Sequence, residues 1–295
     1  MPAPPILFCF GLGLTGTALA RALIGDGWEV RGTVREPDKR SALAEQGIAA
    51  KLFDGETFDG DATAALDGST HMLSCVPPDE GGDPVLTWLG ERIRTLGLDW
   101  AGYLSTTGVY GDRAGDWVDE TSPLKPTGVR GRARVKAEAA WREAGDAHGL
   151  PVHIFRLAGI YGPGRNALET VRAGTARRVV KPGQLFARIH VDDIVSVLRA
   201  SIDRPRPGAT YNVCDDEPAP AQDVVAYACR LLDVAPPPEE PFEKAVASGS
   251  LSDMAQSFYA DNRRVANRLI KEELGVRLAY PSYREGLDAL VQEMS

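Results

Sequence analysis

The sequence predicts an α/β protein with a doubly wound parallel sheet and a smaller carboxyl-terminal lobe. Two observations predict this fold class. Short apolar runs alternate with helical patterns, and strands joined through helices form parallel sheets with helices on both faces. In addition, the glycine motif at residues 11–16 lies between the first apolar run and the first helical pattern, which is the place of the dinucleotide fingerprint in a Rossmann-type sheet.

The first strand and helix are the clearest elements. Residues 6–10 (ILFCF) form a continuous apolar run, which is typical of a parallel strand buried on both faces. From Leu14 onward, apolar residues recur on one stripe of a helix, and Gly27 ends it. The same patterns predict strands at 29–34, 49–53, 71–76 and 102–106, and helices at 38–46 and 84–96.

The second half of the chain is less regular. A loop rich in Pro and Gly at 111–128 precedes a long helix over 131–147 and a strand at 152–157, and further helical segments are predicted at 189–201, which begins as a strand, and 222–232. We expect a dinucleotide-binding domain over 1–159, to which 189–215 returns, and a substrate lobe formed by 160–188 and 216–295.

Composition excludes several classes of protein. Net charge is -8 with acidic and basic residues spread along the chain, so a nucleic-acid partner is not expected. No apolar run approaches the roughly 18 residues of a membrane span, and the first basic residue is Arg21, so no secretory signal is expected and the cytoplasm is the expected location. The cysteines lack metal-site spacing, so no metal is expected and all should be reduced: Cys9, Cys75, Cys214 and Cys229.

The glycine motif has a physical role at each position. Gly11 permits a tight turn, Gly13 lets the backbone approach a pyrophosphate, and Gly16 lets the helix pack closely on the strand. With Leu14 and Thr15, the motif brings amides at the positive end of a helix to the phosphates. The alternative is that these glycines only form a strand-to-helix turn.

The residue after the second strand bears on the choice of cofactor. Domains that prefer NAD usually place an acid there to bind the ribose 2′-hydroxyl, whereas this strand ends at Arg35. A guanidinium can pair with a 2′-phosphate, so NADP is favoured. Alternatively, Arg35 is a solvated loop residue and Glu36 turns inward to bind NAD.

Two later strand ends should also reach the cofactor. Asp54, which follows the third strand, could accept a hydrogen bond from the adenine amino group, or it could be an ordinary surface acid. Ser74 and Val76 lie at the carboxyl end of the fourth strand, where ligands of open α/β sheets bind.

The chain resembles the extended short-chain dehydrogenase/reductase (SDR) family, which includes nucleotide-sugar epimerases and dehydratases. The resemblance covers nearly the whole length and implies a seven-stranded sheet, a small substrate lobe and a small-molecule substrate, and it suggests a homodimer. The segments that carry it are GLGLTG (11–16), GTVRE (32–36), YLSTTGVYGD (103–112), FRLAGIYGPG (155–164), RIHVDD (188–193) and YNVCDDEP (211–218).

The resemblance also implies catalytic positions, and here the sequence departs from the pattern. Thr106 falls where the family has a Ser or Thr that bonds the reacting oxygen. Arg130 and Arg134 fall where the family has its catalytic Tyr and Lys, and an arginine stays protonated, so it cannot replace a phenol as acid and base. They could bind an anionic ligand group and the ribose, respectively, or lie on a solvated basic helix face.

Other candidate site groups have ordinary alternatives. Tyr110 or Tyr161 could supply the missing acid but would more often pack at strand ends. His190 could touch substrate but is better read as a helix-capping residue. Arg156 and Arg165 could contact an anionic substrate tail. Phe10 replaces the early glycine of the family's phosphate motif. Together with the missing Tyr/Lys pair, this departure makes the chain resemble the atypical branch of the family.

The leading hypothesis is therefore an NADP-dependent oxidoreductase or epimerase/dehydratase-like enzyme of the atypical extended SDR type. One rival is a binding protein that senses NAD(P)(H) and has lost catalysis along with the Tyr/Lys pair. Another is an enzyme that holds NAD tightly through an epimerase cycle without net change in the cofactor.

Overall fold

The structure, a computed structural model that describes residues 3–294, contains two compact units. The first comprises residues up to 106 together with Arg132–Arg156 and Val197–Tyr211. The second comprises Thr107–Gly131, Leu157–Ser196 and the residues from 212 onward. Each unit has its own cluster of packed apolar side chains.

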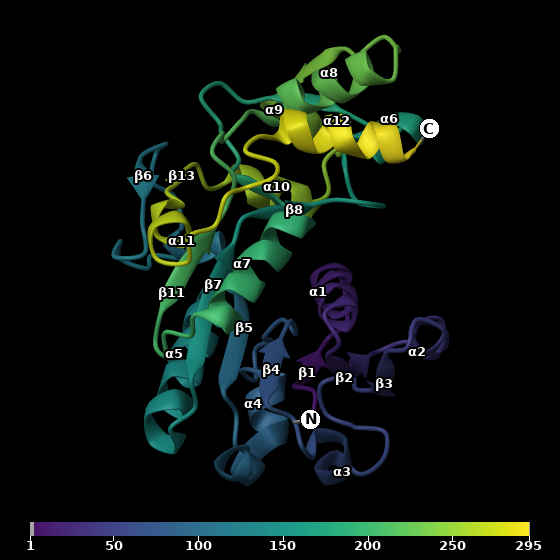
Figure 1. The fold of residues 1–295 in the computed structure, drawn as a ribbon. Coiled ribbons are helices and arrows are strands. Elements are labelled where there is room, and N and C mark those ends of the chain that lie inside the picture. The colour runs from purple at the N-terminus through teal and green to yellow at the C-terminus, as the bar shows by residue number, and fades with distance from the viewer. Residues whose placement is uncertain (1–2, 295) are drawn as a thin grey trace. The chain divides into compact units, whose positions relative to one another are not determined.

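A seven-stranded sheet organises the first unit, and the predicted Rossmann-type parallel sheet is confirmed. The strand order is β11-β7-β5-β4-β1-β2-β3, so the chain starts in the middle of the sheet and winds outward in both directions (Figure 1). Parallel ladders place Cys9 beside Gly32 on one side and beside Leu73 on the other. The strands are β1 (Ile6–Phe10), β2 (Glu29–Val34), β3 (Ala49–Leu52), β4 (His71–Ser74), β5 (Trp100–Thr106), β7 (Val152–Leu157) and β11 (Thr210–Val213).

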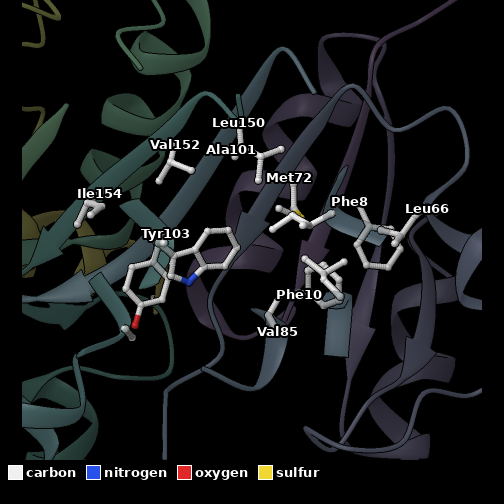
Figure 2. Packing of buried hydrophobic residues seen from close by; sticks show 14 of the residues in the cluster. Phe8, Phe10, Leu66, Met72, Val85, Ala101, Tyr103, Leu150, Val152 and Ile154 are labelled. Atoms are coloured by element: carbon white, nitrogen blue, oxygen red, sulfur yellow. The ribbon is translucent and has the colours of Figure 1, made fainter. Parts of the chain in front are cut away.

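Helices cover this sheet. The helices that begin in this part of the chain are α1 (Leu14–Gly25), α2 (Pro37–Ala44), α3 (Ala62–Leu66), α4 (Pro84–Leu89), the 3₁₀ helix η1 (Gly90–Thr95) and α5 (Val129–His148), which starts in the second unit. A large apolar cluster lies between one face of the sheet and the helices α3, α4, η1 and α5. Figure 2 shows the cluster, in which Phe8 lies beside Leu66 and Phe10 lies beside Val85 of the covering helices. Met72 and Tyr103 of the strands belong to the same cluster.

Most predicted boundaries shift by one or two residues, and three differences from the sequence-based expectation have a clear physical reason. The helix predicted over 84–96 ends at Leu89, because Gly90 adopts a φ of +48° and the chain continues as η1. The fourth strand ends at Ser74 instead of residue 76, since Cys75 and Val76 already belong to the turn before Pro77. Strand β11 was not predicted as a separate strand, because four residues carry too little pattern.

The second unit is built from short elements around two apolar clusters, one centred on Leu168 and Leu287 and the other on Val179 and Tyr259. Three two-stranded parallel ladders join β10 (Arg188–His190) to β8 (Gly159–Tyr161), β12 (Glu239–Pro241) to β9 (Arg178–Val180) and β13 (Arg264–Val265) to β6 (Trp117–Val118). The remaining helices are η2 (Thr107–Tyr110), α6 (Ala167–Arg172), α7 (Val191–Asp203), α8 (Ala221–Leu231), α9 (Phe242–Ala247), α10 (Asp253–Tyr259), α11 (Arg268–Glu272) and α12 (Tyr283–Glu293). Among the described residues, no helix has the length and apolar character needed to cross a membrane.

Candidate dinucleotide-binding site

The glycine loop after β1 is held in place by strand β2. Gly11 has a φ of +84°, a left-handed conformation that favours glycine. Its amide donates to Oγ1 of Thr33 at 2.9 Å, and the Leu12 amide donates to the Thr33 carbonyl at 2.7 Å. Thr33 is buried, so it fixes the point where the chain leaves the sheet. Sequence reasoning missed Thr33, because a threonine inside a strand is unremarkable without knowledge of its partner.

Gly13 and Gly16 differ in the space around them. A Cβ on Gly16 would lie 2.9 Å from the Cys9 sulfur and 2.9 Å from the Gly11 carbonyl oxygen, so α1 can approach β1 this closely only with glycine there. Gly13 is exposed, and the atom nearest to a Cβ on it would be 3.9 Å away. The protein's own packing therefore does not require glycine at residue 13, whereas a ligand close to the backbone would.

Helix α1 begins directly after this loop, and its first amides have no hydrogen-bond acceptor within residues 3–294. Gly13 is the N-cap and has no side chain to bond them, and the first turn contains no acidic residue. The amides of Leu14, Thr15 and Gly16 precede the first helical hydrogen bond, which runs from the Thr17 amide to the Gly13 carbonyl at 3.0 Å. Free amides at the positive end of a helix bind anions, so this loop fits the diphosphate of a dinucleotide.

The two residues that follow β2 present opposite charges to solvent. Arg35 and Glu36 are both exposed. Within residues 3–294, Arg35 makes no hydrogen bond or ion pair. Glu36 is the N-cap residue of α2, but its carboxylate does not bond the helix amides. Both side chains are therefore available to a ligand.

Asp54 shapes its own loop. Its Oδ1 accepts hydrogen bonds from the amides of Glu56 at 2.9 Å and Thr57 at 2.8 Å. These bonds hold the pKa of the exposed Asp54 carboxyl below its usual value. One oxygen is thus used by the turn, and only Oδ2 is left for an adenine amino group.

The turn after β4 packs against the glycine loop. Ser74 is fully buried, and its hydroxyl has no hydrogen-bond partner in the part of the chain that the structure describes. The Cys75 amide donates to the Phe10 carbonyl at 2.8 Å. A Cβ on Gly11 would lie 3.3 Å from Cγ2 of Val76, so Val76 covers the first glycine.

Arg134 is docked on the carboxyl-terminal part of β5. Its Nη1 donates to the Leu104 carbonyl and, at 3.1 Å, to the Tyr103 hydroxyl, and its guanidinium carbon lies 5.6 Å from the centre of the Tyr103 ring. Thr106 is the last residue of the same strand and is partly exposed. Because Arg134 is partly buried and bonded, it is not part of a freely solvated basic face.

Arg130 is placed differently. Arg130 is exposed in the first turn of α5 and belongs to the second unit. Thr106 and Arg134 belong to the first unit. Arg132 and Lys136 are exposed as well. The structure therefore brings Arg134 to the strand that ends in Thr106, and it leaves Arg130 in solvent.

Glu138 and Arg156 form a buried ion pair next to Ser105 of β5, and this pair corrects the expected role of Arg156. Glu138 and Arg156 are buried, and Nη2 of Arg156 donates to Oε2 of Glu138 at 2.7 Å. The Ser105 hydroxyl donates to Oε1 of the same carboxylate at 2.6 Å. The expectation that Arg156 contacts a substrate tail is wrong, because its guanidinium is committed to Glu138 inside the first unit.

The candidate acids of the second unit are buried. The Tyr110 hydroxyl donates to Oδ1 of Asn212 at 2.7 Å. Burial raises the pKa of Tyr161 well above its usual value. Nδ1 of His190 accepts from the Asp192 amide at 3.2 Å, as a helix-capping residue would, and burial lowers the pKa of its ring.

Comparison with known proteins gives the chain a family context. The family model described as "NAD dependent epimerase/dehydratase family" matches residues 86–214. Protein YeeZ of Escherichia coli strain K12 is 30% identical over 290 residues, which cover 92% of this chain and 94% of YeeZ.

A solved structure and a curated reductase are also similar over nearly the whole chain. The structure of a conserved protein of unknown function from Silicibacter pomeroyi is 52% identical with a TM-score of 0.89, and the match covers 98% of this chain and 99% of that one. A 3-diazoavenalumate denitrifying reductase of Streptomyces sp is 26% identical, over 96% of this chain and 98% of the reductase.

Proposed function

Because this chain belongs to the NAD dependent epimerase/dehydratase family of extended SDR proteins, we propose that it is an NADP-dependent oxidoreductase that acts on a small molecule. The observation that carries the proposal is the glycine loop, in which Gly16 packs on Cys9 and the first amides of α1 have no partner in the part of the chain that the structure describes. Leu14, Thr15 and Gly16 would bind the diphosphate through these amides.

Arg35 would select NADP over NAD. Its guanidinium follows β2 directly and has no partner among the described residues, so it can form a charge-assisted pair with a 2′-phosphate. Glu36 beside it is the residue that would instead favour NAD by accepting from a ribose 2′-hydroxyl. We place the phosphate on Arg35, because a carboxylate and a phosphate repel each other.

The reacting end of the cofactor would lie at the carboxyl ends of β4 and β5, where open α/β sheets bind ligands. When bound there, the nicotinamide supplies or accepts a hydride. The hydroxyl of Thr106 would donate a hydrogen bond to the reacting oxygen. Val76, the partly exposed residue that covers Gly11 in the turn after β4, would line the cofactor at this end, whereas the Ser74 hydroxyl is fully buried.

Arg134 changes the chemistry expected at this position. A guanidinium remains charged, so it can hold a ribose hydroxyl or stabilise negative charge on a reacting oxygen, but it does not deliver a proton. We therefore propose a reduction in which electrostatic stabilisation replaces the phenol, and water supplies the proton. The relative in Streptomyces is named a reductase, which supports net reduction over an epimerase cycle.

A second candidate function is that of an NADP(H) sensor without turnover. This function is favoured by the missing catalytic tyrosine. The chain has no tyrosine between Tyr110 and Tyr161, and both of these phenols are buried.

Assaying NADPH oxidation with ketones, aldehydes and sugar nucleotides separates the two functions. Under the proposed function at least one substrate is reduced, and Thr106→Val lowers kcat about 100-fold, as expected for loss of one donor to a developing oxyanion. The same variant should bind NADPH as the wild type does, and Thr95→Val on η1 serves as the matched control. Binding of NADPH without turnover of any substrate would favour the sensor.

A further inference from the structure

We propose that Cys9 and Cys75 form a redox-active dithiol, which hydroperoxides oxidise to a disulfide that disables the glycine loop. Both cysteines are free, and their sulfurs lie 3.9 Å apart. They come from neighbouring parallel strands, since Cys9 lies in β1 and Cys75 is the first residue after β4. A 66-residue separation in sequence hides the pair from any search for a CxxC motif.

The surroundings of the two sulfurs place them at the dinucleotide loop. A Cβ on Gly16 would lie 2.9 Å from the Cys9 sulfur and 3.6 Å from the Cys75 sulfur, so both thiols lie against the first turn of α1. The other two cysteines belong to the second unit, where the Cys214 thiol donates to the Val265 carbonyl at 3.2 Å. Cys214 and Cys229 therefore serve as internal controls.

Differences in exposure assign the order of reaction. Cys75 is partly exposed, whereas Cys9 is fully buried, so Cys75 meets the oxidant first. Contact with Cys75 and burial raise the pKa of the Cys9 thiol well above its usual value, which keeps Cys9 protonated and unreactive toward peroxide. Cys75 is thus the attacking thiol and Cys9 the resolving thiol.

The proposed oxidation consumes one hydroperoxide in two balanced steps. The Cys75 thiolate attacks one oxygen of hydrogen peroxide, the O–O bond breaks, and hydroxide leaves and becomes water, which produces a sulfenic acid. The Cys9 sulfur then attacks the Cys75 sulfur, the S–O bond breaks, and the leaving hydroxide takes the Cys9 proton as a second water. The two thiols lose two electrons and two protons, and the peroxide is reduced to two waters.

Closing the disulfide should distort the loop. A disulfide bond is about 2.05 Å long, so the sulfurs must approach by about 2 Å. Cys9 is held by ladders on both sides of β1, and the turn at 75–78 must therefore move. That turn covers Gly11, because Val76 and the Cys75 backbone would lie 3.3 and 3.5 Å from a Cβ there. This coupling to nucleotide binding, unlike disulfide formation itself, rests on the proposed function.

The test is to treat the reduced full-length protein with hydrogen peroxide and map its thiols by mass spectrometry of non-reduced peptides. We expect one intramolecular Cys9–Cys75 disulfide, slower formation with saturating NADPH, and at least tenfold weaker NADPH binding that dithiothreitol restores. Cys9→Ser should form no disulfide and should leave a sulfenic acid on Cys75 that dimedone traps. Cys229→Ala should behave as the wild type.

Several results would overturn the inference, and they differ from failure of the proposed function. Oxidation of Cys75 to sulfinic acid without a disulfide, or a disulfide only between two molecules, would exclude the resolving role of Cys9. A Cys9–Cys75 disulfide that leaves NADPH affinity unchanged would exclude the coupling. Absence of nucleotide binding in the reduced protein would instead reject the proposed function, while the peptide map would still decide on the dithiol.

Discussion

At the end of β2, the adjacent side chains of Arg35 and Glu36 allow a test of cofactor choice at the level of a single residue. We predict that Arg35→Ala weakens NADPH binding more than tenfold and leaves NADH binding nearly unchanged, because only the 2′-phosphate loses a charge-assisted hydrogen bond. Isothermal calorimetry with both cofactors measures this difference. Glu36→Ala is the matched control and should not weaken NADPH binding. An equal loss for NADPH and NADH would contradict the role of Arg35.

The role of a single residue could be predicted from the sequence only where the residues it contacts lie close to it in the chain. The three glycines could be assigned roles because the motif fixes their positions relative to β1 and α1. The docking of Arg134 on the Leu104 carbonyl could not, since 30 residues separate the two. For the same reason Arg156 was assigned wrongly, because its partner Glu138 lies on a different element.

At the scale of elements, the junction of β1 and α1 offers a matched pair of substitutions. We predict that Gly13→Ala folds with nearly wild-type stability but loses most NADPH affinity, because its methyl group has space within the protein and would occupy the approach of the phosphates. Gly16→Ala should lower the free energy of unfolding by about 1–3 kcal/mol, since its methyl group overlaps the Cys9 sulfur and the Gly11 carbonyl.

Denaturant unfolding and NADPH titration of both variants check this pair. A Gly13→Ala protein that binds NADPH like the wild type would show that the phosphates do not approach the backbone at that residue. A Gly16→Ala protein as stable as the wild type would show that α1 can withdraw from β1 at little cost.

Element types were easier to predict than element ends. Long apolar runs such as 6–10 and 152–157 identified buried strands with correct limits. The break inside 84–96 escaped prediction because it depends on the left-handed conformation of Gly90, and a glycine within a helical pattern does not by itself indicate a break. Short strands such as β11 owe their conformation to sheet partners that the local sequence does not contain.

At the scale of the whole molecule, one buried group in each unit should contribute to the pH dependence of stability, and the two contributions have opposite signs. In the first unit, burial lowers the pKa of His153 from 6.5 to about 4. Between these values the unfolded chain binds a proton that the folded chain does not, so this contribution to stability is lost as pH falls. In the second unit, burial raises the pKa of Asp215 from 3.8 to about 8. There the folded chain holds the extra proton, so stability is lost as pH rises.

Thermal unfolding from pH 4 to pH 9 tests this prediction with one variant for each unit. The Tm of Asp215→Asn relative to that of the wild type should increase as pH rises toward 8. The Tm of His153→Gln relative to that of the wild type should increase as pH falls below 6.5. In the wild type, the Arg206 amide donates a hydrogen bond to Nε2 of His153 at 2.8 Å, and the glutamine of His153→Gln keeps an acceptor for it. Differences in Tm that do not change with pH would contradict the assigned titrations.

The central claim is that the glycine loop and Arg35 bind NADP, and calorimetric titration of the reduced protein with NADPH and with NADH tests it most directly. The account predicts one NADPH bound per chain, with NADH binding at least tenfold more weakly. Failure of both nucleotides to bind would contradict the assignment of the loop, and tighter binding of NADH would contradict the assignment of Arg35.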